Sequence, residues 1–428
     1  NSQWLYGLAE KDRFGDRIHL GLAMSMLFAL PAQPEVAGVL FGAVIVWYLI
    51  RLHFWKKYIL SGPLWVMAPG ILWIAVLAVA LTWSSDTNFG WRIVWAQRWI
   101  VLITVLWPLM SRWRILLLAA LLGCLLQSIT QWIQGTFNIG PESIPGLSDH
   151  PRPGAAWQAS AIVGVLILYV SGILKNRWWL ITLIPLTVGV LIAHSRGAIL
   201  AIALSIPLSM IILLATRTLI VPRVWSVVAF LVVAVLLGSI YKGKISPSIS
   251  AAYQNSTNAI SKNEITDPRL VWWKSSYRQW KTHPIFGYGT GGTKEAFQDD
   301  PLLYEEGKKT NWYDHENETY LEGRVINEFN QPHSIYFQVL VENGIAGILG
   351  GGFLITMTIL IGWRTAKNHP LGTLGLSMLS VWLITGAFDS WYSQGQTTAL
   401  FWFAATIASI HPLCYQEPKD THTDKPLL

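Results

Sequence analysis

Stretches of mostly apolar residues, each close to membrane-spanning length, recur twelve times along the chain with polar connections between them. About 20 apolar residues in an α-helix cross the hydrocarbon core of a bilayer. The pattern therefore predicts an all-α polytopic membrane protein, with about twelve transmembrane helices in a single transmembrane domain over residues 1–428. The twelve runs cover residues 18–31, 36–51, 64–82, 93–110, 115–134, 155–174, 178–193, 197–216, 224–241, 344–362, 371–387 and 396–411.

The composition agrees with a chain that lies in lipid. Of the 428 residues, 52% are hydrophobic and 13% are charged, whereas soluble domains carry about 25% charged residues. Many of the 24 tryptophans lie near the ends of apolar runs, as Trp83, Trp91, Trp178 and Trp363 do. Tryptophan is enriched where a membrane meets water. These features exclude a set of soluble domains and make the lipid bilayer a partner of the chain.

Lysine and arginine are unevenly distributed over the short connections. With both termini on the inner side, the inner connections hold sixteen of these residues and the outer ones hold four. Inner loops of membrane proteins are enriched in positive charge, so we expect both termini to be cytoplasmic. The same asymmetry explains the excess of 31 Lys and Arg over 24 Asp and Glu, so we expect no nucleic-acid partner. The first residues lack an apolar run followed by a small-residue cleavage site, and we expect no removable signal peptide.

One connection is much longer than the others. Residues 242–332 form a polar segment on the outer side, inserted between the ninth and tenth spans, with 11 Lys and Arg and 12 Asp and Glu. Its stretch "RLVWWKSSYRQW" has aromatic residues at helical spacing, which predicts a helix. Long loops in compact chains commonly carry function, so we expect this loop to contribute to the site.

Four basic side chains are predicted to meet on the outer side. His333 precedes the tenth span, Arg196 lies between the seventh and eighth, Arg152 precedes the sixth, and Arg269 lies in the long loop. Guanidinium groups bind phosphate oxygens in bidentate fashion, and imidazole suits proton abstraction near neutral pH. A base beside a diphosphate clamp is what glycosyl transfer from a lipid diphosphate requires.

Each of these residues also has a plainer interpretation. A histidine at a helix entrance is commonly a cap, Arg196 can extend to the lipid headgroups, and Arg269 can be a solvated loop charge. Arg98 lies inside the fourth run, where a charge is costly and faces protein or water. It is either structural or part of the same cavity.

Several familiar motifs carry little weight here. "GYGTGG" (residues 287–292) matches G-x-G-x-x-G, but no βαβ pattern surrounds it, so we expect a loop turn. "DHE" (residues 314–316) and "DD" (residues 299–300) have metal-ligand chemistry but are more typical of loop solvation. Cys124 and Cys414 offer neither a metal spacing nor a disulfide framework. We expect no metal and no cofactor.

Three motifs together resemble the O-antigen ligase and O-antigen polymerase superfamily. They are "SRGAILA" (195–201), "DPRLVWWKSSYRQWKTHPIFGYGTGG" (267–292) and "PHSIYFQVLVENGIAGILG" (332–350). The family pattern has an arginine turn, then an Arg-x-x-x-Trp helix leading to His-Pro-x-x-Gly-x-Gly, then a histidine before an aromatic–aliphatic helix and a Glu-x-Gly-x-x-Gly turn. "PRPGAAWQAS" (151–160) resembles a weaker upstream motif of the family.

The resemblance implies a metal-independent glycosyltransferase of GT-C type in the bacterial inner membrane, with its active site facing the periplasm. Its donor would be O-antigen on undecaprenyl diphosphate, and a ligase would use lipid A–core as acceptor. His333 would be the catalytic base, Arg196 and Arg269 would bind the donor diphosphate, and Arg152 would assist. Ser334 departs from the Asn that many members have after the histidine. Glu342 matches the family's turn, and we assign it a structural role.

The resemblance also divides the last motif. Residues 334–342 are expected to form a short helix at the rim, and the true span is expected to begin at the Gly344 turn.

Within the superfamily, three activities compete: ligase, polymerase and protein O-oligosaccharyltransferase. One large outer loop on twelve spans is more similar to a ligase, because polymerases often have a second large arginine-bearing outer loop, and residues 135–154 are shorter. A lipid-diphosphate transporter or flippase is the alternative of another class. It would show paired, broken spans in two related halves, which the sequence does not display.

Overall fold

The computed structural model describes residues 12–52, 63–137, 146–147, 151–193, 195–225, 268–308, 313–314, 319–320, 330–390 and 394–409. The ninth predicted run from residue 226 onward, residues 242–267 of the long loop, and Cys414 lie outside these ranges. The described residues are helical except for short connections and one antiparallel pair of two-residue strands, β1 (Tyr313–Asp314) and β2 (Thr319–Tyr320). The strand pair is the one departure from the all-α prediction in this part of the chain.

Ten of the predicted apolar runs coincide with helices. These are α2 (Arg13–Ala29), α3 (Pro34–Ile50), α5 (Pro63–Ala80), α8 (Trp113–Phe137), α9 (Pro151–Val170), η4 (Arg177–Thr182) with α10 (Leu183–Ile192), α11 (Arg196–Ala215), α17 (Ile335–Ala366), α18 (Pro370–Gly386) and α19 (Gly395–Ala408). Local signals start several of them: the Ser195 hydroxyl caps α11 by accepting from Ala198 N, and Pro370 opens α18.

The fourth predicted run, residues 93–110, is not one helix. The chain is divided there into α6 (Thr87–Ala96), η2 (Gln97–Val101), α7 (Leu102–Leu106) and η3 (Trp107–Arg112). Pro108 has no N–H for a helical bond, and Arg98 Nη1 donates to the carbonyl of Trp95, which competes with the helical partner of that carbonyl. The polar and proline positions inside an apolar run thus cause the interruption.

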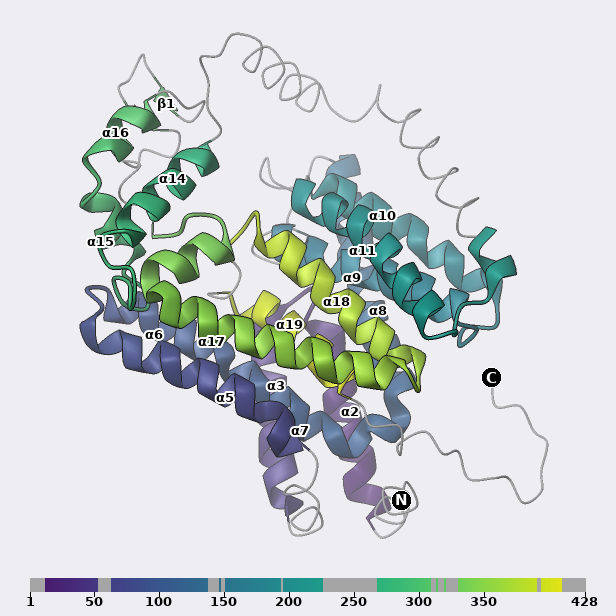
Figure 1. Cartoon of the computed structure of the whole chain (residues 1–428). Coiled ribbons are helices and arrows are strands. Elements are labelled where there is room, and N and C mark those ends of the chain that lie inside the picture. Colours follow the sequence, from purple (N-terminus) through teal and green to yellow (C-terminus); the bar gives the residue numbers. More distant parts are fainter. Residues whose placement is uncertain are drawn as a thin grey trace, which may run out of the picture.

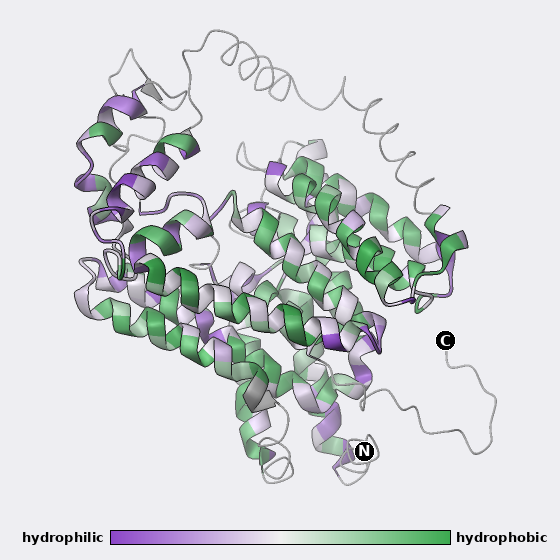
Figure 2. Cartoon of the chain, viewed as in Figure 1, coloured by the Kyte–Doolittle hydropathy of each residue, from purple (hydrophilic) through white to green (hydrophobic). Residues whose placement is uncertain are grey.

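Five stretches of the described chain are long and apolar enough to cross a membrane by length and composition. They are Val66–Trp83, Thr87–Phe137, Pro151–Val170, Arg196–Ala215 and Ile335–Ala366. Shorter apolar helices add to them, so the protein is a multi-pass membrane protein. Figure 2 shows hydrophobic residues over the whole length of these helices and polar residues concentrated in α14–α16 (Pro268–Trp280, Thr293–Gln298 and Pro301–Gly307).

Three helices form the centre of the bundle. Nearly every residue of α9, α18 and α19 is buried, which is typical of helices that are apolar on all sides and surrounded by others. Polar side chains also link them to neighbours. On α9, Gln158 Nε2 donates to Gln131 Oε1 of α8 at 2.7 Å, and Trp157 Nε1 donates to the carbonyl of Gln396 at 3.1 Å.

A row of serines joins α11 to α18. Ser209 and Ser377 hydroxyl oxygens are 2.6 Å apart, and Ser380 donates to Ser205 at 2.7 Å. Small residues let helix backbones approach closely, and their hydroxyls bond across the interface. The row fixes the position of α11, and therefore of the arginine at its start.

The long loop contributes a small group of helices at the end of the bundle where α17 begins (Figure 1). The aromatic stretch predicted to be helical is α14, which confirms that prediction. Arg278 ties this helix to α16, because its guanidinium donates to Asp300 Oδ2 at 2.7 Å and to both Glu306 oxygens at 3.1 Å.

Helix α17 is broken at Gly344, where φ is 59° and ψ is −152°. This confirms the predicted division of the segment into two helices at the Gly344 turn. The break leaves carbonyls on one side and N–H groups on the other without helical partners, and such groups are costly unless they are paired.

Residues 284–289 supply partners for four of these groups. The bonds are Tyr288 N to Val341 O (3.0 Å), Gly289 N to Glu342 O (2.7 Å), Ile345 N to Pro284 O (3.0 Å) and Ala346 N to Ile285 O (3.0 Å). The loop is also fixed to α5, since Thr290 Oγ1 donates to the carbonyl of Leu77 at 2.8 Å. The predicted loop turn "GYGTGG" is therefore confirmed. Together with the residues before it, the turn pairs with backbone groups on both sides of the break in α17.

The glycines of this turn allow the close approach. Gly287 has a φ of 65°, and a Cβ there would lie 2.5 Å from the backbone carbonyl of Glu342. We expect Gly287→Ala to destabilise the protein by about 2 kcal/mol or more, because strain at such a position alone costs about 1–3 kcal/mol. The thermal unfolding midpoint in detergent measures this.

Gly352→Ala on α17 is the matched control. No atom lies within 4 Å of a Cβ added there, and alanine favours helix by up to about 1 kcal/mol over glycine. An equal unfolding midpoint for the two variants would contradict the proposal that the close contact of the loop with α17 stabilises the protein.

Candidate active site

The segment that enters α17 is held by α14. Trp273 Nε1 donates to the carbonyl of Pro332 at 3.1 Å, and its ring stacks on Phe337 with centroids 5.4 Å apart. The next residue, His333, has a φ of 52°, in the left-handed region that non-glycine residues seldom adopt. Such a conformation costs about 1–3 kcal/mol and persists only where the surroundings enforce it, which is common at functional sites.

The imidazole of His333 lies between an indole and a carboxylate. Its ring centroid is 4.9 Å from that of Trp272, with 33° between the planes. Its Nδ1 is 3.7 Å from Oδ1 of Asp389, and 19% of the side chain is exposed. One ring nitrogen, Nδ1, therefore faces the acid.

Asp389 connects His333 to Arg152. Its Oδ2 lies 3.4 Å from Arg152 Nη1, and its Oδ1 accepts from Ser390 N at 2.9 Å. The Asp389 side chain is almost buried, whereas that of Arg152 is 41% exposed. Arg152 thus balances the charge of Asp389 and keeps the rest of its guanidinium at the surface.

Asp389 was not among the residues predicted from the sequence. A signal was present, because the acid lies two residues after the apolar run 371–387, and ionisable residues beside spans are commonly functional. Its partner His333 is 56 positions earlier, and no spacing in the sequence joins the two.

Arg196 is the first residue of α11 and is exposed. The following Gly197 packs against Phe388, since a Cβ added there would lie 3.5 Å from the Phe388 side chain. Phe388 immediately precedes Asp389. The structure therefore places Arg196 beside the segment that carries the acid.

Arg269 is the second residue of α14 and is half-buried. It lies three residues before Trp272, so the two side chains share one face of the helix. Trp272 contacts the His333 ring. Of the four residues predicted from the sequence, His333 and Arg152 thus both lie against Asp389. Arg196 directly precedes the glycine that packs against Phe388, and Arg269 lies on the face of α14 that carries Trp272.

Arg98 lies close to the same region but is held by aromatic rings. Its guanidinium carbon is 5.0 Å from the centroid of Trp95 and 5.5 Å from that of Trp99. A Cβ added to Gly395 would lie 3.8 Å from Arg98 Nη2, so the side chain packs against the start of α19. These contacts favour the structural interpretation of Arg98.

Glu342 is fully buried below the site. Its Oε1 accepts from Thr293 Oγ1 at 2.7 Å and from Gln338 Nε2 at 2.9 Å. Asn343 Nδ2 donates to Thr290 Oγ1 at 2.8 Å. These bonds attach the glycine turn and α15 to the rim helix, in agreement with the structural role assigned to Glu342.

The acidic motifs of the long loop have other contacts. Asp300 caps α16 and pairs with Arg278, and Asp314 lies in β1, while residues 315–316 fall outside the described ranges. Within the described residues, no group of three or more His, Cys, Asp and Glu side chains lies close enough together to hold a metal ion.

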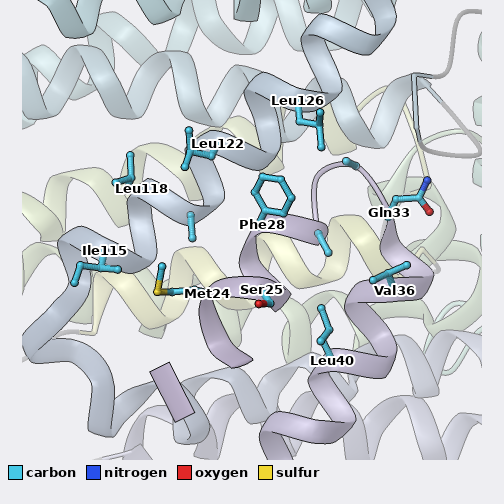
Figure 3. Close-up of a pocket in the computed structure, with 13 residues that line it drawn as sticks. Met24, Ser25, Phe28, Gln33, Val36, Leu40, Ile115, Leu118, Leu122 and Leu126 are labelled. Carbon is cyan, nitrogen blue, oxygen red and sulfur yellow. The ribbon is translucent and has the colours of Figure 1, made fainter. Parts of the chain in front are cut away.

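An apolar cavity of about 490 Å³ lies away from this site, between α2, α3 and α8 (Figure 3). Its lining is aliphatic and aromatic apart from Ser25 and Gln33. It contains none of the predicted site residues.

The arrangement suits proton abstraction beside a developing negative charge. The Asp389 carboxylate lies 3.7 Å from the imidazole Nδ1, and the Arg152 guanidinium lies 3.4 Å from the same carboxylate. Such a site can deprotonate a hydroxyl while cations stabilise an anionic leaving group.

Comparison with known protein families gives one match, which covers part of the chain. Residues 180–351 match the family model described as O-antigen ligase, and this range holds Arg196, Arg269 and His333 together with the glycine turn. No curated protein matches the chain. Over residues 180–351 the chain is therefore similar to the O-antigen ligase family.

Proposed function

We propose that this protein is an O-antigen ligase. It transfers polysaccharide from undecaprenyl diphosphate to a sugar hydroxyl of lipid A–core, in lipopolysaccharide biosynthesis. The observation that carries the proposal is the contact of His333 with Asp389 on a rim with Arg152 and Arg196, within a membrane protein that has an O-antigen ligase domain.

In the proposed reaction, Nε2 of His333 accepts the proton of the acceptor hydroxyl. The acceptor oxygen forms a bond to the anomeric carbon of the donor while the bond from that carbon to the diphosphate oxygen breaks. The electron pair leaves with the lipid diphosphate, and the proton stays on His333 until water removes it. Asp389 holds Nδ1 and stabilises the imidazolium that forms, as carboxylates do for catalytic histidines.

The arginines act on the leaving group. Arg196 and Arg269 bind the diphosphate of the donor, since a fixed guanidinium fork matches phosphate oxygens. Arg152 assists from the opposite side of Asp389, with the part of its guanidinium that does not face the carboxylate. No residue of this scheme requires a metal ion.

The proposed topology has twelve spans of GT-C type in the bacterial inner membrane, with both termini in the cytoplasm. Residues 242–332 form the large periplasmic loop, and the site opens to the periplasm. The sixteen inner against four outer Lys and Arg residues support this orientation. The single large outer loop supports a ligase over a polymerase.

Reconstitution with two acceptors tests the activity. We expect purified protein with lipid-linked glycan to modify lipid A–core covalently, without nucleotide or added metal, and not to extend a second lipid-linked repeat unit. Mass spectrometry of the products distinguishes the acceptors. Extension of the repeat unit instead would identify a polymerase, and movement of intact donor across vesicles without product would identify a flippase.

Substitution of the paired residues tests the base. His333→Asn tolerates the left-handed backbone and should lower turnover by about 10²–10⁴-fold, the usual contribution of a general base, with donor binding retained. Asp389→Asn should lower turnover less. If Asp389 acts through His333, the double variant is no slower than His333→Asn alone, since residues that act as a unit are not additive. Independent, multiplying losses would exclude the pairing.

Substitution of Arg269 tests the clamp. Arg269→Ala removes a charge-assisted contact and should weaken donor affinity by about 1.5–3 kcal/mol, roughly 10–150-fold. Lys274→Ala removes a positive charge from an exposed position of the same helix and should leave affinity unchanged. Titration of lipid-linked glycan against both variants in nanodiscs measures the two donor affinities. Equal affinities would make Arg269 a solvated loop charge.

A further inference from the structure

An apolar turn in the polar outer loop has no role in the chemistry described so far. Between α14 and the glycine turn, Ile285 and Phe286 are 58% and 59% exposed, although Gly287 to Thr290 directly after them are buried. Large apolar side chains side by side at the surface mark a contact with lipid or another molecule when they form part of a larger patch.

The turn adjoins the outward faces of two predicted membrane helices. The carbonyl of Ile285 accepts from Ala346 N, immediately after the break in α17. Beyond that point α17 has an exposed row of Ile345, Ile348 and Leu349. On the other flank, Phe286 makes an edge contact with Trp83, with centroids 6.0 Å apart.

Trp83 itself lies at the end of the stretch Val66–Trp83, which is long and apolar enough to cross a membrane. The exposed Val79 lies one turn earlier on α5. Both flanking helices therefore direct apolar side chains outward up to the level of the turn. Figure 1 shows α5 and α17 running together toward the end of the bundle where α15 lies.

We propose that Ile285, Phe286 and Trp83 form a membrane wedge, which sits in the outer leaflet where acyl chains meet headgroups. The occupant is the bilayer itself, because the wedge adjoins the exposed apolar side chains of α5 and α17. Tryptophan and other aromatic residues favour this zone. A loop that its charge would place in water is thereby attached to the membrane by its tip.

The wedge also determines how far the imidazole of His333 lies from the lipid headgroups. The carbonyls of Pro284 and Ile285 hold the N–H groups that follow Gly344, so the break in α17 lies at the level of the wedge. The rim helix from Ile335 to Asn343 is rigidly attached above it and starts two residues after His333. Lipid contact at the turn therefore keeps the imidazole close to the headgroup layer.

Site-specific labelling tests the wedge without use of the activity. Cys414→Ser leaves the buried Cys124, whose labelling is measured as background. Phe286→Cys is labelled with an environment-sensitive dye in nanodiscs that contain a phospholipid with a doxyl spin label high on its acyl chain. Leu302→Cys is the matched control, since Leu302 is an apolar residue of the same loop with 52% exposure on α16.

We expect the dye at position 286 to emit at shorter wavelength and to be quenched by the doxyl lipid. The dye at position 302 should be quenched by aqueous iodide instead. A dye at Ile285→Cys should behave like that at position 286, which guards against a local effect of one substitution.

Two results would overturn the proposal. In one, positions 285 and 286 are quenched by iodide as strongly as position 302. In the other, they become shielded from iodide only after addition of lipid-linked glycan, which would make the turn a site for the substrate's chain. Loss of transferase activity, or its absence, changes neither readout, so the wedge and the proposed reaction fail separately.

Discussion

The four backbone hydrogen bonds between residues 284–289 and the broken helix α17 determine the geometry of the end of the molecule where α17 begins. An interrupted helix in a membrane protein must pair its freed N–H and carbonyl groups within the protein, because lipid offers them no partner. The loop that pairs them comes from the long polar segment. The same contact therefore satisfies the helix, orders the loop, and connects α5, α14 and α17.

The candidate site follows from that connection. Once the turn is fixed on α17, α14 lies over the rim helix, where Trp272 and Trp273 hold the ring of His333 and the carbonyl before it. The bundle supplies the other half: Arg152 opens α9, Arg196 opens α11, and Asp389 follows α18. A strained histidine is thus held between a loop helix and three helix ends, so its position depends on contacts with both parts.

The helices were the most predictable part of the protein, because each run of apolar residues near membrane length has few other stable forms. The fourth run, residues 93–110, is interrupted because Pro108 and Arg98 change individual hydrogen bonds. The mean hydropathy of the run does not show such changes. Gly344 was predictable as a break from its turn motif. The partner of the break was not, since the glycines of residues 287–292 reveal a tight turn but not the surface that it meets. Asp389 was missed for a similar reason: its importance comes from its distance to His333 in space, and the roles of both remain proposals.

Helix α9 has a consequence for how the protein is assembled. It is enclosed on every side, carries Gln158 bonded to α8 and Trp157 bonded to the start of α19, and has a charged arginine as its second residue. Two of the helices that enclose it, α18 and α19, lie far later in the sequence. They are synthesised after α9, so the buried environment of α9 is complete only when the C-terminal helices have packed against it.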